Sequence, residues 1–240
     1  MLILKVLSVL LSYPEAETLQ ALDELAAIIT QEKRLPETRK DALLVLINTY
    51  QDVDLLDLQE RYVTLFDRGR YLSLHIFEHV HGESRDRGQA MVNLLQLYES
   101  HGFEMSTQEL PDYIPLLLEF LSQQEAKEAI GILQDAMSVM SLLGARLAER
   151  GSEYRSLFDA LESIAGEPQD LAAIRQQAVN EIPDETLLHM DEIWEEEAVS
   201  FMGAGDRCQA QGATVKPVTI TPREQFVRLK ETQKSQRLPL

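Results

Sequence analysis

Cysteine and tryptophan are almost absent from this sequence. Among its 240 residues there is one cysteine, Cys208, and one tryptophan, Trp194. A single cysteine excludes an internal disulfide, a zinc site built from several cysteines and an iron–sulfur cluster held by this chain alone. Because nothing in the cysteine content points to an oxidising compartment, we expect a cytoplasmic protein.

Long uninterrupted hydrophobic runs are also missing. A membrane-spanning helix needs roughly 18 or more consecutive apolar residues, and no stretch reaches that length. The apolar run over residues 1–11 resembles a signal peptide, but Lys5 lies within it. Pro14 and Glu15 then follow where a small-residue cleavage site would stand. We therefore expect no direct insertion into a membrane.

Positive charge is scarce, with 22 Lys and Arg against 40 Asp and Glu, and the formal net charge is −18. Nucleic acids and anionic membrane surfaces are excluded as main partners, since such a field repels both. The charge is uneven, because residues 203–240 carry seven basic and three acidic side chains. The −18 overall and +4 in this tail leave −22 on residues 1–202. A basic or amphipathic partner is favoured.

Alternating strand-like patterns and hairpin dipeptides such as Asn-Gly are missing too, whereas apolar residues recur at helical spacing. The sequence therefore predicts an all-α, single-domain multi-helix bundle over residues 1–202, followed by a flexible, net basic tail over 203–240. The predicted helices cover residues 2–12, 15–32, 37–50, 54–66, 85–101, 109–123, 125–150, 153–165, 168–180 and 184–201.

One polar segment, from Asp67 to Gln89, stands out from these helices. Eleven of the twenty-one positions between Asp67 and Arg87 are ionisable, and they alternate with apolar residues such as Leu74 and Phe77. A plain solvated linker does not have this composition. The pattern indicates either the rim of a binding site or a buried network of ion pairs that joins two helical halves.

The histidines of this segment raise two further hypotheses. His75, His79, His81 and Glu83 could form a His/carboxylate metal site. However, the order of residues is not His-Glu-x-x-His, and Gly82 interrupts any helix, so histidines paired to nearby carboxylates are favoured over metal. Catalysis has no support, because no nucleophile or phosphate loop accompanies the adjacent Glu78 and His79.

The segment and its surroundings resemble a known family. FEHVHGESRDRGQAM at residues 77–91, LFDRGR at 65–70 and ELPDYIPL at 109–116 closely resemble the nitrate reductase molybdenum cofactor assembly chaperones of the NarJ type, within the TorD/DmsD-like superfamily. The resemblance extends from Tyr13-Pro14 to the acidic residues around Trp194 and fades in the tail. A motif of this length is far more specific than the short patterns above.

The resemblance implies an all-helical chaperone and no enzymatic activity. Such proteins bind the apo catalytic (alpha) subunit of respiratory nitrate reductase through its N-terminal segment, assist insertion of the molybdenum cofactor and an iron–sulfur cluster before membrane docking, and leave the finished enzyme. It also implies no permanently bound cofactor and no metal, and leaves open a transient contact with the client's molybdenum cofactor and with cofactor-delivery proteins. Another molybdenum oxidoreductase is the alternative client.

We expect the client segment to bind as an amphipathic helix in a groove. The candidate binding residues include charged rim residues and apolar wall residues: Asp67, Phe77, Glu78, His79, His81, Glu83, Asp86, Tyr98, Tyr113, Leu116 and Leu117. Tyr98 at helical spacing is also typical of a core, and Tyr113 between two prolines could instead fix a helix entry. Four arginines are candidates for internal ion pairs or for contact with a cofactor phosphate: Arg68, Arg70, Arg85 and Arg87.

The basic tail suggests one more hypothesis, that it covers the acidic groove until a client displaces it. If a chain ending at Met202 bound client peptide with unchanged affinity and salt dependence, this hypothesis would be wrong.

Overall fold

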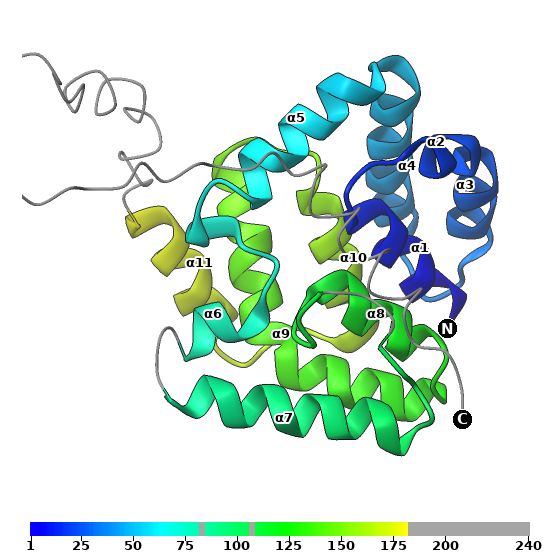
Figure 1. Ribbon diagram of the computed structural model, residues 1–240. Helices are drawn as coiled ribbons and strands as arrows, with labels where there is room; N and C mark the ends of the chain where they lie inside the picture. Colours follow the sequence, from blue (N-terminus) through cyan, green and yellow to red (C-terminus); the bar gives the residue numbers. More distant parts are fainter. Residues whose placement is uncertain (82–84, 106–108, 182–240) are drawn as a thin grey trace, which may run out of the picture. The chain divides into compact units, whose positions relative to one another are not determined.

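The computed structural model describes residues 1–81, 85–105 and 109–181, which form eleven α-helices and one 3-10 helix (Figure 1). In chain order they are α1 Leu2–Leu11, α2 Ala16–Gln20, α3 Leu22–Gln31, α4 Glu37–Asp52, α5 Leu55–Phe66, η1 Arg70–Leu72, α6 Ile76–Val80, α7 Arg85–Ser100, α8 Ile114–Ser122, α9 Ala126–Glu149, α10 Arg155–Ala165 and α11 Leu171–Asn180. Within this part of the chain the only extended pairing is an isolated bridge between His75 and Tyr113. The all-α prediction is confirmed.

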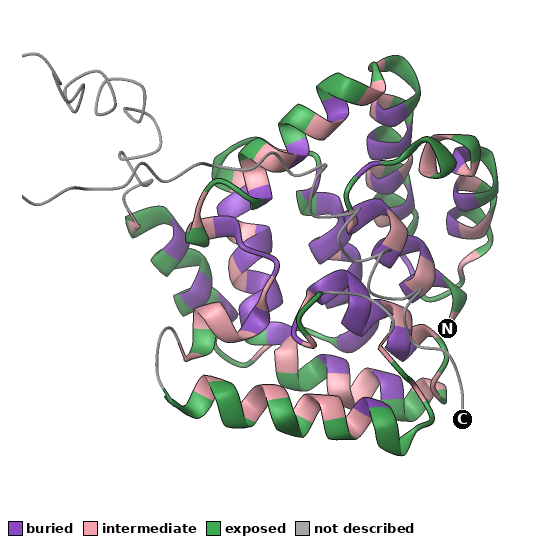
Figure 2. Ribbon diagram, in the orientation of Figure 1, coloured by how far each residue is buried: buried purple, intermediate pink, exposed green. Residues whose placement is uncertain are grey.

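Helices α1 and α8 form the most apolar part of the core. They pack against each other, and both are hydrophobic nearly all round, which is typical of helices enclosed by neighbours (Figure 2). The hydroxyl of Ser8 on α1 donates a 2.7 Å hydrogen bond to the carbonyl of Pro115 in the first turn of α8. A polar group buried between the two helices is therefore satisfied.

Helix α9 is the platform on which α10 and α11 pack, and it also contacts α6, α8 and η1. Its approach to α10 is close at Gly144, where an added Cβ would lie 2.9 Å from the Cβ of Phe158. Of the described helices, α9 alone is long and apolar enough to cross a bilayer, but 50% of its most apolar window is buried inside the protein. A core helix has this pattern.

The C-terminal end of α1 is closed by two tyrosine hydroxyls. Tyr50 of α4 donates to the carbonyl of Leu10 and Tyr62 of α5 donates to the carbonyl of Leu11, each at 3.1 Å. The last carbonyls of a helix have no partner within it, so these bonds allow α1 to end inside the protein. They also fix α4 and α5 against α1.

Several helix predictions need correction. The expected helix over 15–32 is two helices, because Ala21 adopts a turn whose N–H bonds to the carbonyls of both Glu17 and Thr18. The expected helix over 109–123 begins only at Ile114, since Tyr113 is extended and pairs with His75. The helix expected from 168 begins at Leu171. The short helices η1 and α6 were not predicted.

Some sequence predictions lie outside the described residues. These are the helix over 184–201, the boundary at residue 202, the tail and its proposed contact with the groove, and the candidate site residue Glu83. They stay predictions.

Candidate functional site

The polar segment that follows α5 folds onto a buried carboxylate. Asp112 has no exposed surface, and its two side-chain oxygens accept hydrogen bonds from the backbone N–H of Phe77 at 2.9 Å and from Nδ1 of His75 at 3.2 Å. The backbone of Asp112 also accepts from the N–H of Ile76 at 3.1 Å. These bonds hold the start of α6, so Asp112 positions the segment, a role that the sequence alone did not assign.

Asp112 and the charges around it determine the ionisation of His75. The hydrogen bond that His75 donates to Asp112 is the largest influence, and it raises the pKa of His75 despite the opposing effect of burial. Glu78 and Glu109 add to this rise by their negative charge. The imidazole ring also lies 5.5 Å from the ring of Tyr113. His75 is thus bound on one side and exposed on the other.

A second buried group, Arg146 of α9, holds the other side of the segment. Its guanidinium forms two bonds to the carboxylate of Glu181, at 2.7 and 2.8 Å, and a third to the carbonyl of Tyr71 at 2.7 Å. The guanidinium also lies over the ring of Tyr71, 4.3 Å from its centroid. Such bidentate and stacked geometry suits arginine rather than lysine. Arg146 therefore connects α9 to η1 and to Glu181, the residue that follows α11.

His79 bridges the segment to Arg146. Its Nε2–H donates to the carbonyl of Ser73 at 2.8 Å, which leaves Nδ1 as an acceptor facing Nη1 of Arg146 at 3.3 Å. Burial lowers the pKa of His79, and the positive charge of Arg146 lowers it further. Both ring nitrogens have partners in the neutral form, so His79 contributes to the structure of the rim rather than to a free binding surface.

Glu78 on α6 forms an internal ion pair with an arginine. Internal pairing is one of the two hypotheses for the arginines of this segment, and contact with a cofactor phosphate is the other. The carboxylate of Glu78 lies 3.2 Å from Nη2 of Arg87 on α7. Burial alone would raise the pKa of Glu78, but hydrogen bonds from Ser73 and Arg87 outweigh burial and lower it. Arg85 and Asp86, at the start of α7, are exposed.

The segment forms one side of a pocket of about 680 Å³, which we call the tyrosine pocket. Its lining includes five predicted residues, Asp67, Arg68, Arg70, Glu78 and Tyr113. The aromatic part of the lining comes from the residues after α1, from α5 and from the residues before α8: Tyr13, Tyr62, Phe66 and Tyr113. Two carboxylates that the sequence interpretation missed, Glu15 and Glu109, stand at its edge.

Three predicted wall residues are not at this surface. Tyr98, Leu117 and Leu116 are 0%, 3% and 9% exposed. The two leucines are buried because α8 is enclosed by α1 and α9, and the Tyr98 hydroxyl donates to the carbonyl of Pro111 at 2.8 Å, which attaches α7 to the body. We therefore leave them out of the binding surface. Phe77 is half-buried, and its ring lies 5.6 Å from that of His81.

The three histidines do not converge on a common point. His75 faces Asp112, His79 faces Ser73 and Arg146, and His81 lies beside Phe77. In residues 1–81, 85–105 and 109–181, no group of three or more His, Cys, Asp or Glu side chains is placed to hold a metal ion.

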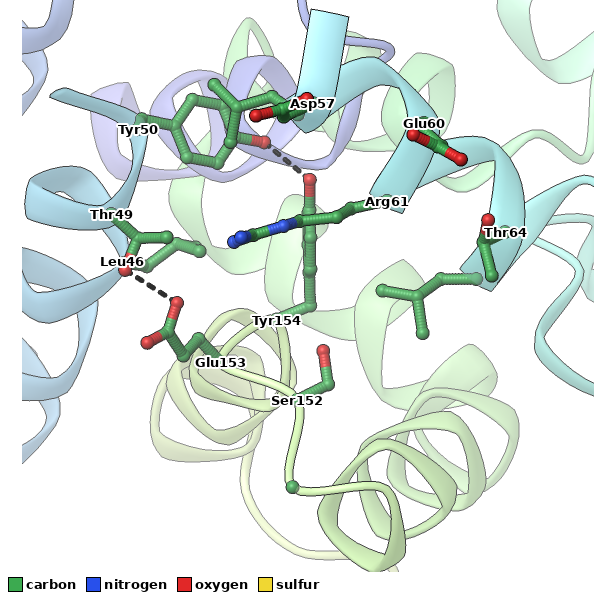
Figure 3. A pocket seen from close by; sticks show the side chains of 13 residues that line it. Leu46, Thr49, Tyr50, Asp57, Glu60, Arg61, Thr64, Ser152, Glu153 and Tyr154 are labelled. Atoms are coloured by element: carbon green, nitrogen blue, oxygen red, sulfur yellow. Dashed lines mark hydrogen bonds between the residues drawn. The ribbon is translucent and has the colours of Figure 1, made fainter. Parts of the chain in front are cut away.

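A second pocket of about 630 Å³ lies between α4, α5 and the turn from α9 to α10, and we call it the α4–α5 pocket (Figure 3). The hydroxyls of Tyr50 and Tyr154 are 2.7 Å apart at its floor, and Glu153 accepts from Thr49 at 2.6 Å. Arg61 reaches from α5 across the pocket beside Tyr154. This pocket contains none of the predicted site residues.

The chain is similar to known proteins over most of its length. The model of the family described as nitrate reductase delta subunit matches residues 14–160. The chain is 44% identical over 209 residues to the nitrate reductase molybdenum cofactor assembly chaperone NarJ of Escherichia coli K12, covering 86% of this chain and 89% of NarJ. The chain belongs to this family of assembly chaperones. Its members are chaperones rather than catalysts, so the protein is not an enzyme.

Other members of the assembly chaperone family match across most of the fold. The probable chaperone NarW of Escherichia coli K12 is 40% identical over 204 residues, with 84% of each chain covered. The probable NarJ of Bacillus subtilis is 35% identical over 155 residues, with 65% of this chain and 83% of that protein covered. The family match at residues 14–160 includes every tyrosine pocket residue except Tyr13 and ends before α11.

Proposed function

We propose that the protein is a dedicated chaperone for the apo catalytic subunit of a respiratory nitrate reductase, and that it binds the N-terminal segment of that subunit in the tyrosine pocket. In this proposal it holds the subunit open for insertion of the molybdenum cofactor and an iron–sulfur cluster, delays docking on the membrane subunit, and dissociates afterwards. It acts in the cytoplasm, alongside cofactor-delivery proteins.

One observation carries the proposal. Each of the three stretches that link the sequence to the assembly chaperones contributes to the lining of one pocket, where Asp67, Glu78 and Tyr113 come together from separate parts of the chain. Phe77 lies on the same short helix, α6, as Glu78, and His81 follows directly after this helix. Both Phe77 and His81 are half-buried. Because the rim is acidic and part of the lining is aromatic, a basic amphipathic segment is the complementary ligand.

The size of the pocket is consistent with peptide recognition through a few anchors. Four buried apolar or aromatic anchors at about 3 kcal/mol each, less about 4 kcal/mol for ordering the segment, leave about 8 kcal/mol, which corresponds to micromolar affinity. Recognition of this kind needs no catalytic group. It also needs no resident cofactor, and any contact with the client's molybdenum cofactor is transient in our proposal.

Peptide titration tests the recognition step. We expect the N-terminal peptide of the nitrate reductase catalytic subunit to bind with micromolar or tighter affinity, and a scrambled peptide of the same composition to bind at least tenfold more weakly. Equal binding of both peptides would refute dedicated recognition. Stronger binding of a peptide from another molybdenum oxidoreductase would assign the protein to that alternative client.

The assembly step needs a separate measurement. The catalytic subunit made in cells that lack the chaperone should contain little molybdenum and less iron, while its polypeptide is still present. Restoring the wild-type chaperone should restore both metals. A catalytic subunit with full molybdenum content in the absence of the chaperone would show that insertion does not depend on it.

A further inference from the structure

We propose that the tyrosine pocket contains a subsite for one cationic side chain, a lysine or arginine of the client's N-terminal segment. This inference rests on the proposed function and specifies which chemical group the pocket selects. It adds Tyr13, Glu15 and Glu109, which the sequence analysis did not assign as binding residues, to the binding surface.

The first observation is an aromatic wall that is open to a ligand. Tyr13 is 43% exposed although its ring packs edge-on against Tyr62, with centroids 5.6 Å apart and planes at 86°. Tyr62 in turn packs against Phe66 at 5.0 Å. An exposed tyrosine held against another ring has less freedom to turn away, and the face of such a ring attracts an ammonium or guanidinium group.

The second observation concerns the hydroxyl groups of the aromatic lining. Tyr62 has one hydroxyl proton, and the carbonyl of Leu11 can only accept, so Tyr62 donates to Leu11. The 2.9 Å bond between the hydroxyls of Tyr62 and Tyr113 is then donated by Tyr113. The Tyr113 oxygen keeps its lone pairs as acceptors, which suits a ligand that carries several N–H donors.

The third observation is the set of carboxylates on the rim. Glu15, Asp67 and Glu109 are exposed. Across the part of the chain that the structure describes, none of the three lies within 4 Å of a lysine or arginine nitrogen, in contrast to Glu78 with Arg87. Burial raises the pKa of Tyr113, and the nearby negative charges of Glu109 and Asp67 raise it further.

The balance of charge around the pocket favours a cation over an anion. Its lining contains the three carboxylates above and Glu78, which pairs with Arg87, against the basic residues Arg68, Arg70 and His75. His75 already pairs with the buried carboxylate of Asp112. The α4–α5 pocket differs, because Arg61 of the protein itself already extends between the carboxylates there (Figure 3). An amphipathic helix could place one cation in the tyrosine pocket and its apolar face beside Phe77.

A double-mutant cycle tests the subsite. The double variant Asp67→Asn, Glu109→Gln is titrated with client peptides in which each lysine and arginine is replaced in turn by glutamine. At one peptide position, the replacement should weaken binding to the wild type about tenfold, as expected for a loss of about 1.4 kcal/mol, and should weaken binding to the variant less than twofold. The variant Tyr13→Leu should reduce the effect of the same position.

The matched control carries the same change of charge in the other pocket. The double variant Asp57→Asn, Glu60→Gln should respond to every peptide as the wild type does, since these residues line the α4–α5 pocket. If no position couples to Asp67 and Glu109 while the wild type still prefers client over scrambled peptide, the subsite is wrong and the proposed function stands. If that preference is itself missing, the proposed function fails first.

Discussion

At the scale of single residues, the histidines between positions 75 and 81 have three different environments. His75 donates to the buried carboxylate of Asp112, and its pKa is raised. His79 is enclosed between a carbonyl and Arg146, and its pKa is lowered, first by burial. His81 packs beside Phe77. The pKa values of His75 and His79 are therefore shifted in opposite directions, which makes their roles separable by experiment.

The variant His75→Gln should show a pH-dependent loss of stability. Because the folded pKa of His75 is raised, its protonated form stabilises the fold fully below the unfolded value of about 6.5, and this contribution disappears as pH rises through the folded pKa. The difference in unfolding free energy between wild type and variant should be larger at about pH 5.5 than at about pH 8.5. Urea unfolding at several pH values measures it.

The variant His79→Gln provides a control of opposite sign. In the wild type the pKa of His79 is lowered by folding. The stability that neutral His79 contributes is therefore present above the unfolded pKa and is lost as pH falls toward the folded pKa. The advantage of wild type over this variant should therefore shrink on acidification. A difference for His75→Gln that does not change with pH would contradict the ionisation of His75 against Asp112, Glu78 and Glu109.

At the scale of elements, α9 is the helix whose packing positions the pocket. It packs against both α10 and α11, while Arg146 near its C-terminal end holds η1 and His79. The contact with α10 depends on Gly144, where an added Cβ would lie 2.9 Å from the Cβ of Phe158. Spacing between α9 and α10 therefore bears directly on the stability of the body.

Replacing Gly144 with alanine should destabilise the protein by about 1–3 kcal/mol, as overpacking of a core does. The new Cβ would lie 2.9 Å from the Cβ of Phe158, an atom next to the backbone that cannot rotate away. The matched control is Gly131→Ala in the same helix, where no atom lies within 4 Å and the better helix propensity of alanine should stabilise by about 0.5–1 kcal/mol. Urea unfolding distinguishes the two, and equal effects would contradict the close approach.

The same scale shows what the sequence can and cannot predict. Most helix positions follow from apolar spacing and prolines, because these signals are local. The break at Ala21 has no glycine or proline to announce it. The site depends on distant pairs: His75 and Asp112 are 37 positions apart, and His79 and Arg146 are 67 apart. The motif located the polar segment, and helical spacing already offered the core position that Tyr98 occupies, but one sequence could not show which residues complete the site or that Leu116 and Leu117 are buried.

At the scale of the whole molecule, the net negative charge and the local contacts of the tyrosine pocket both contribute, in our proposal, to binding a basic client segment. Residues 1–202 carry −22, and the tyrosine pocket has more carboxylates than arginines. A net field of one sign accelerates the approach of an oppositely charged ligand, and local apolar contacts then slow its departure. For a basic client segment the two effects are separable, because salt screens the first much more than the second.

Added salt should therefore slow the association of the client peptide far more than it speeds dissociation. Between about 10 mM and 200 mM salt, the association rate constant should fall about tenfold or more, as for electrostatically steered complexes, while the dissociation rate constant changes less than threefold. Stopped-flow fluorescence of a labelled peptide measures both. A peptide with its lysines and arginines replaced by glutamine is the control, and its association rate should barely depend on salt. If the basic and neutral peptides showed the same salt dependence, the acidic body would have no part in steering, and recognition would rest on the contacts within the tyrosine pocket alone.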